Sequence, residues 1–168
     1  AVLSRSYSYV QIIMASHLHS EGEHAEELIM ESPNMNKWVT EIVSDNDPED
    51  LSYFPNMNGK HLFKNEVTRF EEVINAGLNH NNLKAKDINL LIPHQANLRI
   101  SQFVQKKFNL RDDQVYNNIM RYGNTTAASI PICLYEAQKV GRLKKGALVL
   151  IVSFGSGFTW GANLIRWA

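Results

Sequence analysis

A short and almost wholly apolar run near the middle of the chain constrains the fold more than any other feature of the sequence. The run Ile88-Asn89-Leu90-Leu91-Ile92 is followed at once by Pro93, which cannot continue a central strand. Such a run is typical of a strand covered on both faces, as in sheets with helices on either side. Residues 147–153 have the same character, so we expect two buried strands in one helix-covered sheet.

Segments with helical periodicity separate the buried runs. Apolar residues recur at steps of three and four from Phe63 to Leu78, which predicts one helix that ends near residues 79–80. The order of strands and helices predicts a layered α/β domain with a largely parallel central sheet. We expect further helices at 97–108 and 127–140, the second closed by Gly141, and further strands at 115–119 and 158–167.

The beginning of the chain is less regular. Residues 1–16 alternate and are rich in Val, Ile and Tyr, which predicts two short strands around a Ser-rich turn. Residues 17–58 contain three prolines and many Glu, Asn and Asp side chains, so we expect a long excursion over the surface. The run Ala1-Val2-Leu3 has the pattern of a strand interior and follows no initiator Met, so we expect the beginning of the protein to lie outside this sequence.

Composition argues against several classes of function. The chain has 17 basic and 17 acidic residues, so no global charge attracts nucleic acid or an anionic membrane. A single cysteine excludes an internal disulfide, and no CxxC or HExxH spacing predicts a metal site. No apolar run approaches the ~18 residues of a membrane span, and the first residues lack a signal-peptide pattern. We therefore expect a cytoplasmic protein.

Three loops carry groups suited to chemistry on a carbonyl. Residues 93–97, 122–125 and 154–157 each follow an expected strand, so they should lie at the carboxyl edge of the sheet. His94 offers a tunable imidazole, Asn124 offers an amide donor, and the glycine-rich turn exposes backbone N–H groups. We predict that the loops share one cavity that stabilises charge on a thioester oxygen and that lacks a nucleophile of its own.

Three stretches of the sequence together resemble one family. They are LIPHQANLRI, RYGNTTAASIP and VSFGSGFTWGANLIR, and in this order they resemble the β-ketoacyl-acyl-carrier-protein synthases III, which initiate fatty-acid synthesis. The resemblance covers essentially the whole chain. It implies a thiolase-like fold of two similar layered αβα halves, each with a mixed but mainly parallel central sheet. Residues 1–168 are the C-terminal half, and the other half carries the nucleophilic cysteine.

The resemblance implies an acyltransferase that performs a decarboxylating condensation. Members of the family take a short acyl group from a coenzyme A thioester onto the cysteine and condense it with malonyl-acyl-carrier protein, giving a 3-oxoacyl-acyl-carrier protein. His94 and Asn124 fall on the His and Asn of the family's Cys-His-Asn triad, and the backbone N–H of Ser156 falls on an oxyanion-hole donor. No cofactor is implied, because coenzyme A thioester and carrier phosphopantetheine are substrates.

Binding residues and partners are implied in the same way. The expected partners are the N-terminal half of the same enzyme, an acyl carrier protein and a second copy in a homodimer, and neither nucleic acid nor a membrane is expected. Positions that match the family's substrate-binding residues are Gly59, Phe63, Ala96, Asn97, Phe154 and Gly157, and those that match its carrier-protein docking patch are Lys64, Arg99, Lys106 and Lys107.

Other interpretations of the same residues stay open. Taken alone, a His after a strand is more often structural, an Asn before two threonines is more often a helix cap, and Lys106-Lys107 fits a solvated helix face. The chain as a whole fits a second class of function, a non-catalytic module that binds a carrier protein or an acyl chain. A thiolase or a plant-type polyketide synthase fits less well, because thiolases carry a second cysteine in the last glycine-rich loop and the polyketide enzymes end in a GFGPG-type turn.

Two features are expected to have no catalytic role. Cys133 lies among Ile, Leu and Pro within an expected helix, which predicts a buried thiol rather than a nucleophile. The histidines and carboxylates of residues 17–24 have ligand-like chemistry, but in the family this stretch is a strand exit and a loop. No metal is therefore expected.

Overall fold

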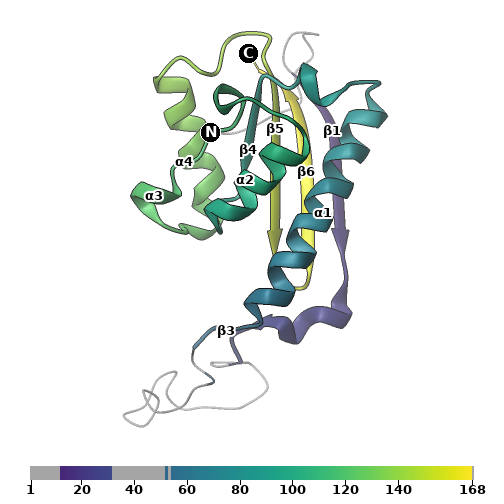
Figure 1. Cartoon of the computed structure of the whole chain (residues 1–168), viewed down its shortest axis with the longest axis vertical. Coiled ribbons are helices and arrows are strands. Elements are labelled where there is room, and N and C mark those ends of the chain that lie inside the picture. The colour runs from purple at the N-terminus through teal and green to yellow at the C-terminus, as the bar shows by residue number, and fades with distance from the viewer. Residues whose placement is uncertain (1–11, 32–51, 53, 168) are drawn as a thin grey trace.

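The computed structural model describes residues 12–31, 52 and 54–167. Figure 1 shows a central sheet whose strands run along the long axis of the molecule, with helices beside it. The helices are Gly59–His80 (α1), Leu98–Lys107 (α2), Ile119–Tyr122 (α3) and Ser129–Lys139 (α4). The strands are Ile12–Ser20 (β1), Leu28–Ile29 (β2), Asn56–Met57 (β3), Leu90–Pro93 (β4), Leu148–Gly155 (β5) and Thr159–Arg166 (β6).

The central sheet is mixed. Its strand order is β1-β6-β5-β4, in which β4 and β5 pair in parallel while β6 pairs antiparallel with both β5 and β1. The predicted α/β class and mixed sheet are confirmed, but antiparallel pairing takes a larger share of the described sheet than expected. The reason is local: only residues 156–158 separate β5 from β6, and a connection this short joins antiparallel strands.

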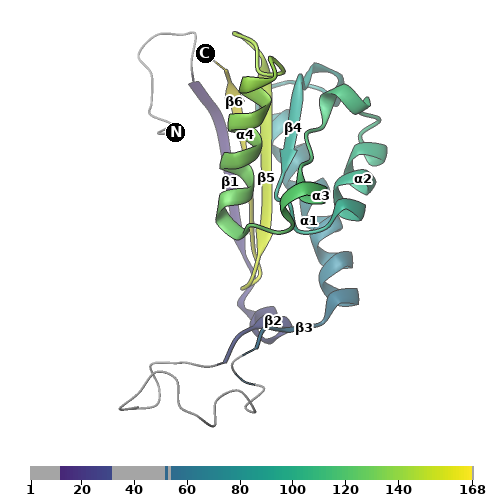
Figure 2. The same cartoon turned by 90° about the vertical axis from the view of Figure 1, so that its left-hand side faces the viewer.

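Helices cover both faces of the buried strands, as predicted. Helices α1 and α2 lie together on one side of the sheet (Figure 2), where Leu91 and Leu150 belong to the same core as α1. Their neighbours along the strands, Leu90 and Val149, pack into a second core that includes Cys133 of α4. Each such side chain contributes roughly 1.5–3 kcal/mol of apolar burial. Within the described residues no helix has the length and apolar character needed to cross a membrane.

The predicted helices form close to their expected bounds. Helix α1 begins after Asn58, whose side chain accepts a hydrogen bond from the backbone N–H of His61, and it ends at His80 as predicted. Helix α4 begins at Ser129, two residues later than expected, because residues 126–128 form a 3-10 turn. Gly141 follows α4 with φ +74°, a conformation that suits glycine, so its predicted role in closing the helix is confirmed.

The strand predicted at 115–119 is wrong. Only Val115 bridges to Leu91 of β4, and the chain then leaves the sheet and enters α3. The backbone N–H groups of Asn118 and Ile119 donate instead to the side-chain oxygen of Gln95, at 2.9 and 3.1 Å. The buried side chain of Gln95 therefore accepts the two N–H groups that would otherwise donate to the carbonyl oxygens of a neighbouring strand.

The predicted excursion at 17–58 begins later than expected. Strand β1 continues to Ser20, because residues 17–20 find hydrogen-bonding partners along residues 159–162 of β6. A 3-10 segment at Gly22–Glu27 and the short β2–β3 pair follow within the same stretch. The two strands predicted at 1–16 fall largely outside the described residues, and β1 covers their end.

Candidate active site

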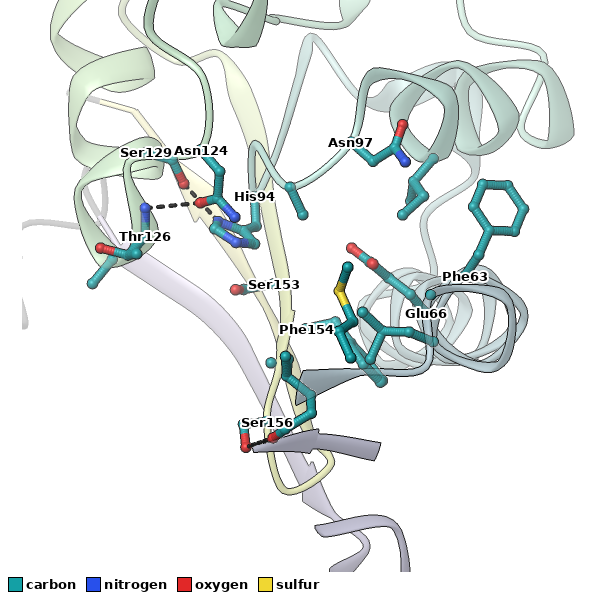
Figure 3. Close-up of a pocket in the computed structure, with 18 of the residues that line it drawn as sticks. Phe63, Glu66, His94, Asn97, Asn124, Thr126, Ser129, Ser153, Phe154 and Ser156 are labelled. Carbon is teal, nitrogen blue, oxygen red and sulfur yellow. Dashed lines mark hydrogen bonds between the residues drawn. The ribbon is translucent and has the colours of Figure 1, made fainter. Parts of the chain in front are cut away.

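A cavity of about 670 Å³ lies at the carboxyl ends of β4 and β5. These strands are parallel, so the loops that follow them emerge at the same edge of the sheet. Figure 3 shows side chains from both loops, from the segment before α4 and from α1 around this space. Of the residues predicted from the sequence, eight line it: His94, Asn124, Ser156, Gly59, Phe63, Ala96, Asn97 and Phe154.

His94 is held at the end of β4 by a serine from α4. Its backbone N–H donates to the Val152 carbonyl, and its Nδ1 atom lies 2.6 Å from Oγ of Ser129. The same Oγ accepts the backbone N–H of Gln95 at 3.3 Å, so the hydroxyl hydrogen is available for Nδ1. We therefore assign the imidazole proton to Nε2. Burial lowers the pKa of His94, which favours this neutral form at pH 7.

Asn124 is fixed by its own loop. Its Oδ1 atom accepts the backbone N–H of Thr126 at 2.8 Å, which occupies the amide oxygen and leaves the amide nitrogen as a free donor. Figure 3 shows the Asn124 amide beside the His94 imidazole. The cap of α4 is Ala128, without a side-chain hydrogen bond, so neither Asn124 nor Thr125 caps this helix as the alternative interpretation expected.

The last loop reaches the cavity through Ser156. Ser156 lines the cavity, but its Oγ donates to the Leu28 carbonyl at 2.7 Å, and Figure 3 shows it at the far end from His94. Gly157 is not among the residues that line this cavity, and its contact with substrate stays a prediction. Its φ is +136° and an added Cβ would lie 3.0 Å from Thr159, so the turn itself requires a glycine here.

Comparison with known proteins identifies the family. Residues 78–167, more than half of the chain, match the family described as 3-oxoacyl-[acyl-carrier-protein (ACP)] synthase III C terminal. The chain belongs to this family. The matched residues include the loops of His94, Asn124 and Ser156, which are the loops that meet at the cavity.

Individual synthases III are similar over most of the chain. The β-ketoacyl-[acyl-carrier-protein] synthase III of Clostridium tetani is 42% identical over 158 residues, which cover 92% of this chain and 47% of the relative. A solved synthase III from Aquifex aeolicus has a TM-score of 0.80 and 38% identity over 98% of this chain and 47% of its own. The solved enzyme from Thermus thermophilus has a TM-score of 0.82 and 33% identity over 96% and 48%. The thiolase-like fold is confirmed, and the chain spans about half the length of the relatives it matches.

Two of the lining residues of the synthase III cavity that the sequence did not predict are polar and almost fully buried. Ser129, which holds His94, is 1% exposed and lies 35 positions away in the chain, so no local pattern links the two. Glu66 is also 1% exposed and lines the cavity from α1. A signal for Glu66 did exist, because it stands three residues after Phe63 and four before Phe70, in register with the apolar stripe of that helix.

The four basic residues predicted to dock a carrier protein are exposed. Lys64 follows Phe63 of the cavity wall, and Arg99 is two residues beyond Asn97 of the same wall. Lys106 and Lys107 lie at the other end of α2, where Lys107 pairs with Glu71 of α1 at 3.1 Å. In the described part of the chain Lys64, Arg99 and Lys106 make no ion pair, so the free positive charge includes two groups close to the cavity.

Cys133 is buried, as predicted. Cys133 is fully buried and donates to Oδ1 of Asn118, and burial raises the pKa of its thiol to about 12. It is therefore uncharged at neutral pH and a poor nucleophile.

The histidines of residues 17–24 do not gather into one group. His17 contacts His80, and His19 stacks on Trp160. Potential ligand atoms within 4.8 Å of one another occur in His24, Glu27 and His61, and in Glu21, Glu23 and His24. Nδ1 of His61 pairs with Glu27 at 2.9 Å, which accounts for part of the first group without an ion.

Proposed function

We propose that this chain is the C-terminal half, residues 1–168, of a β-ketoacyl-acyl-carrier-protein synthase III. In this proposal the chain provides the His and Asn of a Cys-His-Asn triad. The cysteine comes from the proposed N-terminal half of the enzyme, which corresponds to the part of the relatives that this chain does not span. The observation that carries the proposal is the pair His94 and Asn124. Both side chains line one cavity, where Nδ1 of His94 lies 2.6 Å from Oγ of Ser129 and Oδ1 of Asn124 accepts the backbone N–H of Thr126.

This arrangement suits the decarboxylation step. Once the cysteine holds the acyl group from the coenzyme A thioester, the malonyl thioester enters with its carbonyl oxygen between Nε2–H of His94 and the amide nitrogen of Asn124. The bond to the malonyl carboxylate breaks, carbon dioxide leaves, and the electron pair moves onto the thioester as an enolate. Neutral donors fixed in advance stabilise that charge without losing a proton themselves.

Condensation completes the cycle. The enolate carbon attacks the acyl-cysteine carbonyl, and the oxyanion that forms accepts a hydrogen bond from the backbone N–H of Ser156. Collapse of this intermediate breaks the bond to sulfur and releases the cysteine thiolate with 3-oxoacyl-acyl-carrier protein. The position of Ser156 in the cavity wall supports this role.

The remaining wall suits the arm of the substrates. Gly59, Phe63, Ala96, Asn97 and Phe154 present mainly apolar surface, with the amide nitrogen of Asn97 as a donor because its oxygen accepts the N–H of Arg99. We propose that the acidic carrier protein docks on Lys64, Arg99, Lys106 and Lys107, a local positive surface on a chain of balanced charge. We also propose a cytoplasmic homodimer that needs no metal or cofactor.

The decisive experiment uses the complete enzyme, in which this chain is joined to the proposed N-terminal half. His94→Ala should abolish release of carbon dioxide from malonyl-acyl-carrier protein, while mass spectrometry still detects acylation of the catalytic cysteine. Cys133→Ala is the matched control, because removal of this buried thiol should leave both steps intact. Condensation that survives the change at His94 would reject the proposed role, and binding of carrier protein without any turnover would favour the non-catalytic module.

A further inference from the structure

Glu66 has a buried carboxyl group, and the described residues leave one of its oxygen atoms without a hydrogen-bond partner. The residue is 1% exposed, and its Oε1 atom is buried with no hydrogen-bond partner among those residues. It lines the cavity of His94 and Asn124 from α1. Figure 3 shows its carboxyl group pointing away from the helix into that space. A buried polar atom without a partner is uncommon in native proteins and requires an explanation, such as a ligand.

The chemistry of the cavity favours the acid form of this group. Burial raises the pKa of Glu66 to about 8, so at neutral pH it is mainly uncharged and carries one O–H donor and one acceptor oxygen. His94 is the other titratable residue of the described lining, and burial lowers its pKa, so it is also neutral. The elements α2, α4, β2, β3 and β5 contribute uncharged side chains to the lining, and β1 and β6 contribute none.

The surroundings indicate what kind of ligand Glu66 meets. Leu28, Met57, Leu62 and Ile100 line the same cavity, so an occupant needs a mainly apolar chain with an isolated hydrogen-bonding group. A phosphate or a carboxylate would face no cation among the described residues of this lining. The pantetheine arm meets this requirement, because methylene groups separate its two secondary amides. Resting on the proposed function, we propose that Glu66 is a substrate-binding residue that donates a hydrogen bond to an amide carbonyl of the pantetheine arm.

Two variants of the complete enzyme test this role. Glu66→Gln keeps a neutral donor in place, whereas Glu66→Met keeps the length of the side chain and removes the donor. Calorimetry with coenzyme A should give a dissociation constant roughly 3- to 10-fold higher for the Met variant, the effect of one neutral hydrogen bond. The Gln variant should stay within about threefold of the unchanged enzyme. Adenosine 3′,5′-bisphosphate, which lacks the arm, should bind all three proteins equally.

Two further measurements identify the source of the arm and the form of the acid. The KM values for acetyl-coenzyme A and for malonyl-acyl-carrier protein in the Met variant show whether one or both arms use Glu66, and a rise in either supports the proposal. Between pH 7 and pH 9 the unchanged enzyme should lose roughly tenfold in affinity for coenzyme A as Glu66 ionises, and the Gln variant should not. This comparison remains decisive if the Met variant fails to fold.

Clear results would overturn the proposal. The first two are an unchanged affinity for coenzyme A in the Met variant, and a loss of that affinity that is equally large in the Gln and Met variants. The other two are a Met variant that loses as much affinity for the bisphosphate as for coenzyme A, and identical pH profiles of coenzyme A affinity for the unchanged enzyme and the Gln variant. Equal loss in Gln and Met would mean that the carboxylate charge is used, for instance with a cation of the other half. An enzyme that binds coenzyme A but forms no 3-oxoacyl product would refute the proposed function alone, and one that does not bind it would refute both.

Discussion

Replacement of Ser129 by Ala should slow decarboxylation by disturbing His94. The Oγ atom of Ser129 lies 2.6 Å from Nδ1 of His94 and 3.3 Å from the backbone nitrogen of Gln95, and the residue is 1% exposed. Water is therefore poorly placed to replace the hydroxyl. The variant loses the group that fixes the rotation and the tautomer of the imidazole, and it leaves the N–H of Gln95 without this acceptor.

The two consequences have different magnitudes. A buried N–H without an acceptor costs about 1–3 kcal/mol, so the free energy of unfolding should decrease by about that amount. A hydrogen bond from a well-placed imidazole to the charged enolate oxygen contributes roughly 1.5–3 kcal/mol. Loss of most of that contribution corresponds to about a 10- to 100-fold slower decarboxylation.

Three measurements on the complete enzyme check this reasoning. Release of carbon dioxide from malonyl-acyl-carrier protein reports the rate, denaturant unfolding reports the stability, and the ¹⁵N NMR shifts of the His94 ring report the tautomer. Ser153→Ala is the control, because Ser153 lines the same cavity without a described contact to His94. A Ser129→Ala enzyme with the same rate and the same ring shifts would refute the positioning role, even if it were less stable.

Charge reversal at Arg99 and Lys107 should raise the KM for malonyl-acyl-carrier protein several-fold more than the KM for acetyl-coenzyme A, with Arg99 dominant because Lys107 already pairs with α1. Equal changes in both constants would contradict carrier docking. Gly161→Val should lower the free energy of unfolding by about 1–3 kcal/mol, since a Cβ there would lie 2.5 Å from a side-chain carbon and 2.7 Å from a carbonyl oxygen of β1. Gly22→Ala, with nothing within 4 Å, is its control in denaturant titrations. Burial lowers the pKa of His94, so the unfolded chain binds a proton there below about pH 6.5 while the folded chain does not. The free energy of unfolding should therefore decrease as the pH is lowered from about 6.5 to the pKa of His94 in the folded protein. A His94→Gln variant whose free energy of unfolding has the same dependence on pH would contradict this.

The parts of the fold that the sequence predicts well are those determined by local patterns. The apolar stripe from Phe63 to Leu78 placed α1, and the run ending at Pro93 placed β4, because burial on one or both faces leaves its period in the sequence. The loops of His94 and Ser156 meet for the predicted reason, since parallel strands β4 and β5 end at the same edge. The loop of Asn124 reaches the same cavity by another route, because it follows α3 and not the strand predicted at 115–119. His94 and Asn124 do line one cavity as predicted, although the strand that was expected to bring Asn124 there is absent.

The parts that the sequence does not predict depend on partners far along the chain. The side-chain oxygen of Gln95 accepts the backbone N–H groups of Asn118 and Ile119, which lie 23 and 24 positions later in the chain. These two hydrogen bonds replace the expected strand. Ser129 reaches His94 only because α4 returns over the sheet. At Gly157 the backbone of the turn already requires a glycine, so the presence of glycine there is no evidence for or against a contact with a ligand.

The chemistry available on this chain is that of donors rather than of nucleophiles. Its single cysteine, Cys133, is engaged with Asn118 in the core, and burial raises the pKa of the thiol to about 12. His94 and Asn124 have the reverse character, because Ser129 and the loop backbone occupy their acceptor atoms and leave N–H groups for the cavity. Such groups stabilise negative charge on oxygen but cannot form a covalent bond to an acyl group. The donors of this chain therefore suit the decarboxylation half of the proposed reaction, whereas Cys133 does not suit the acylation half.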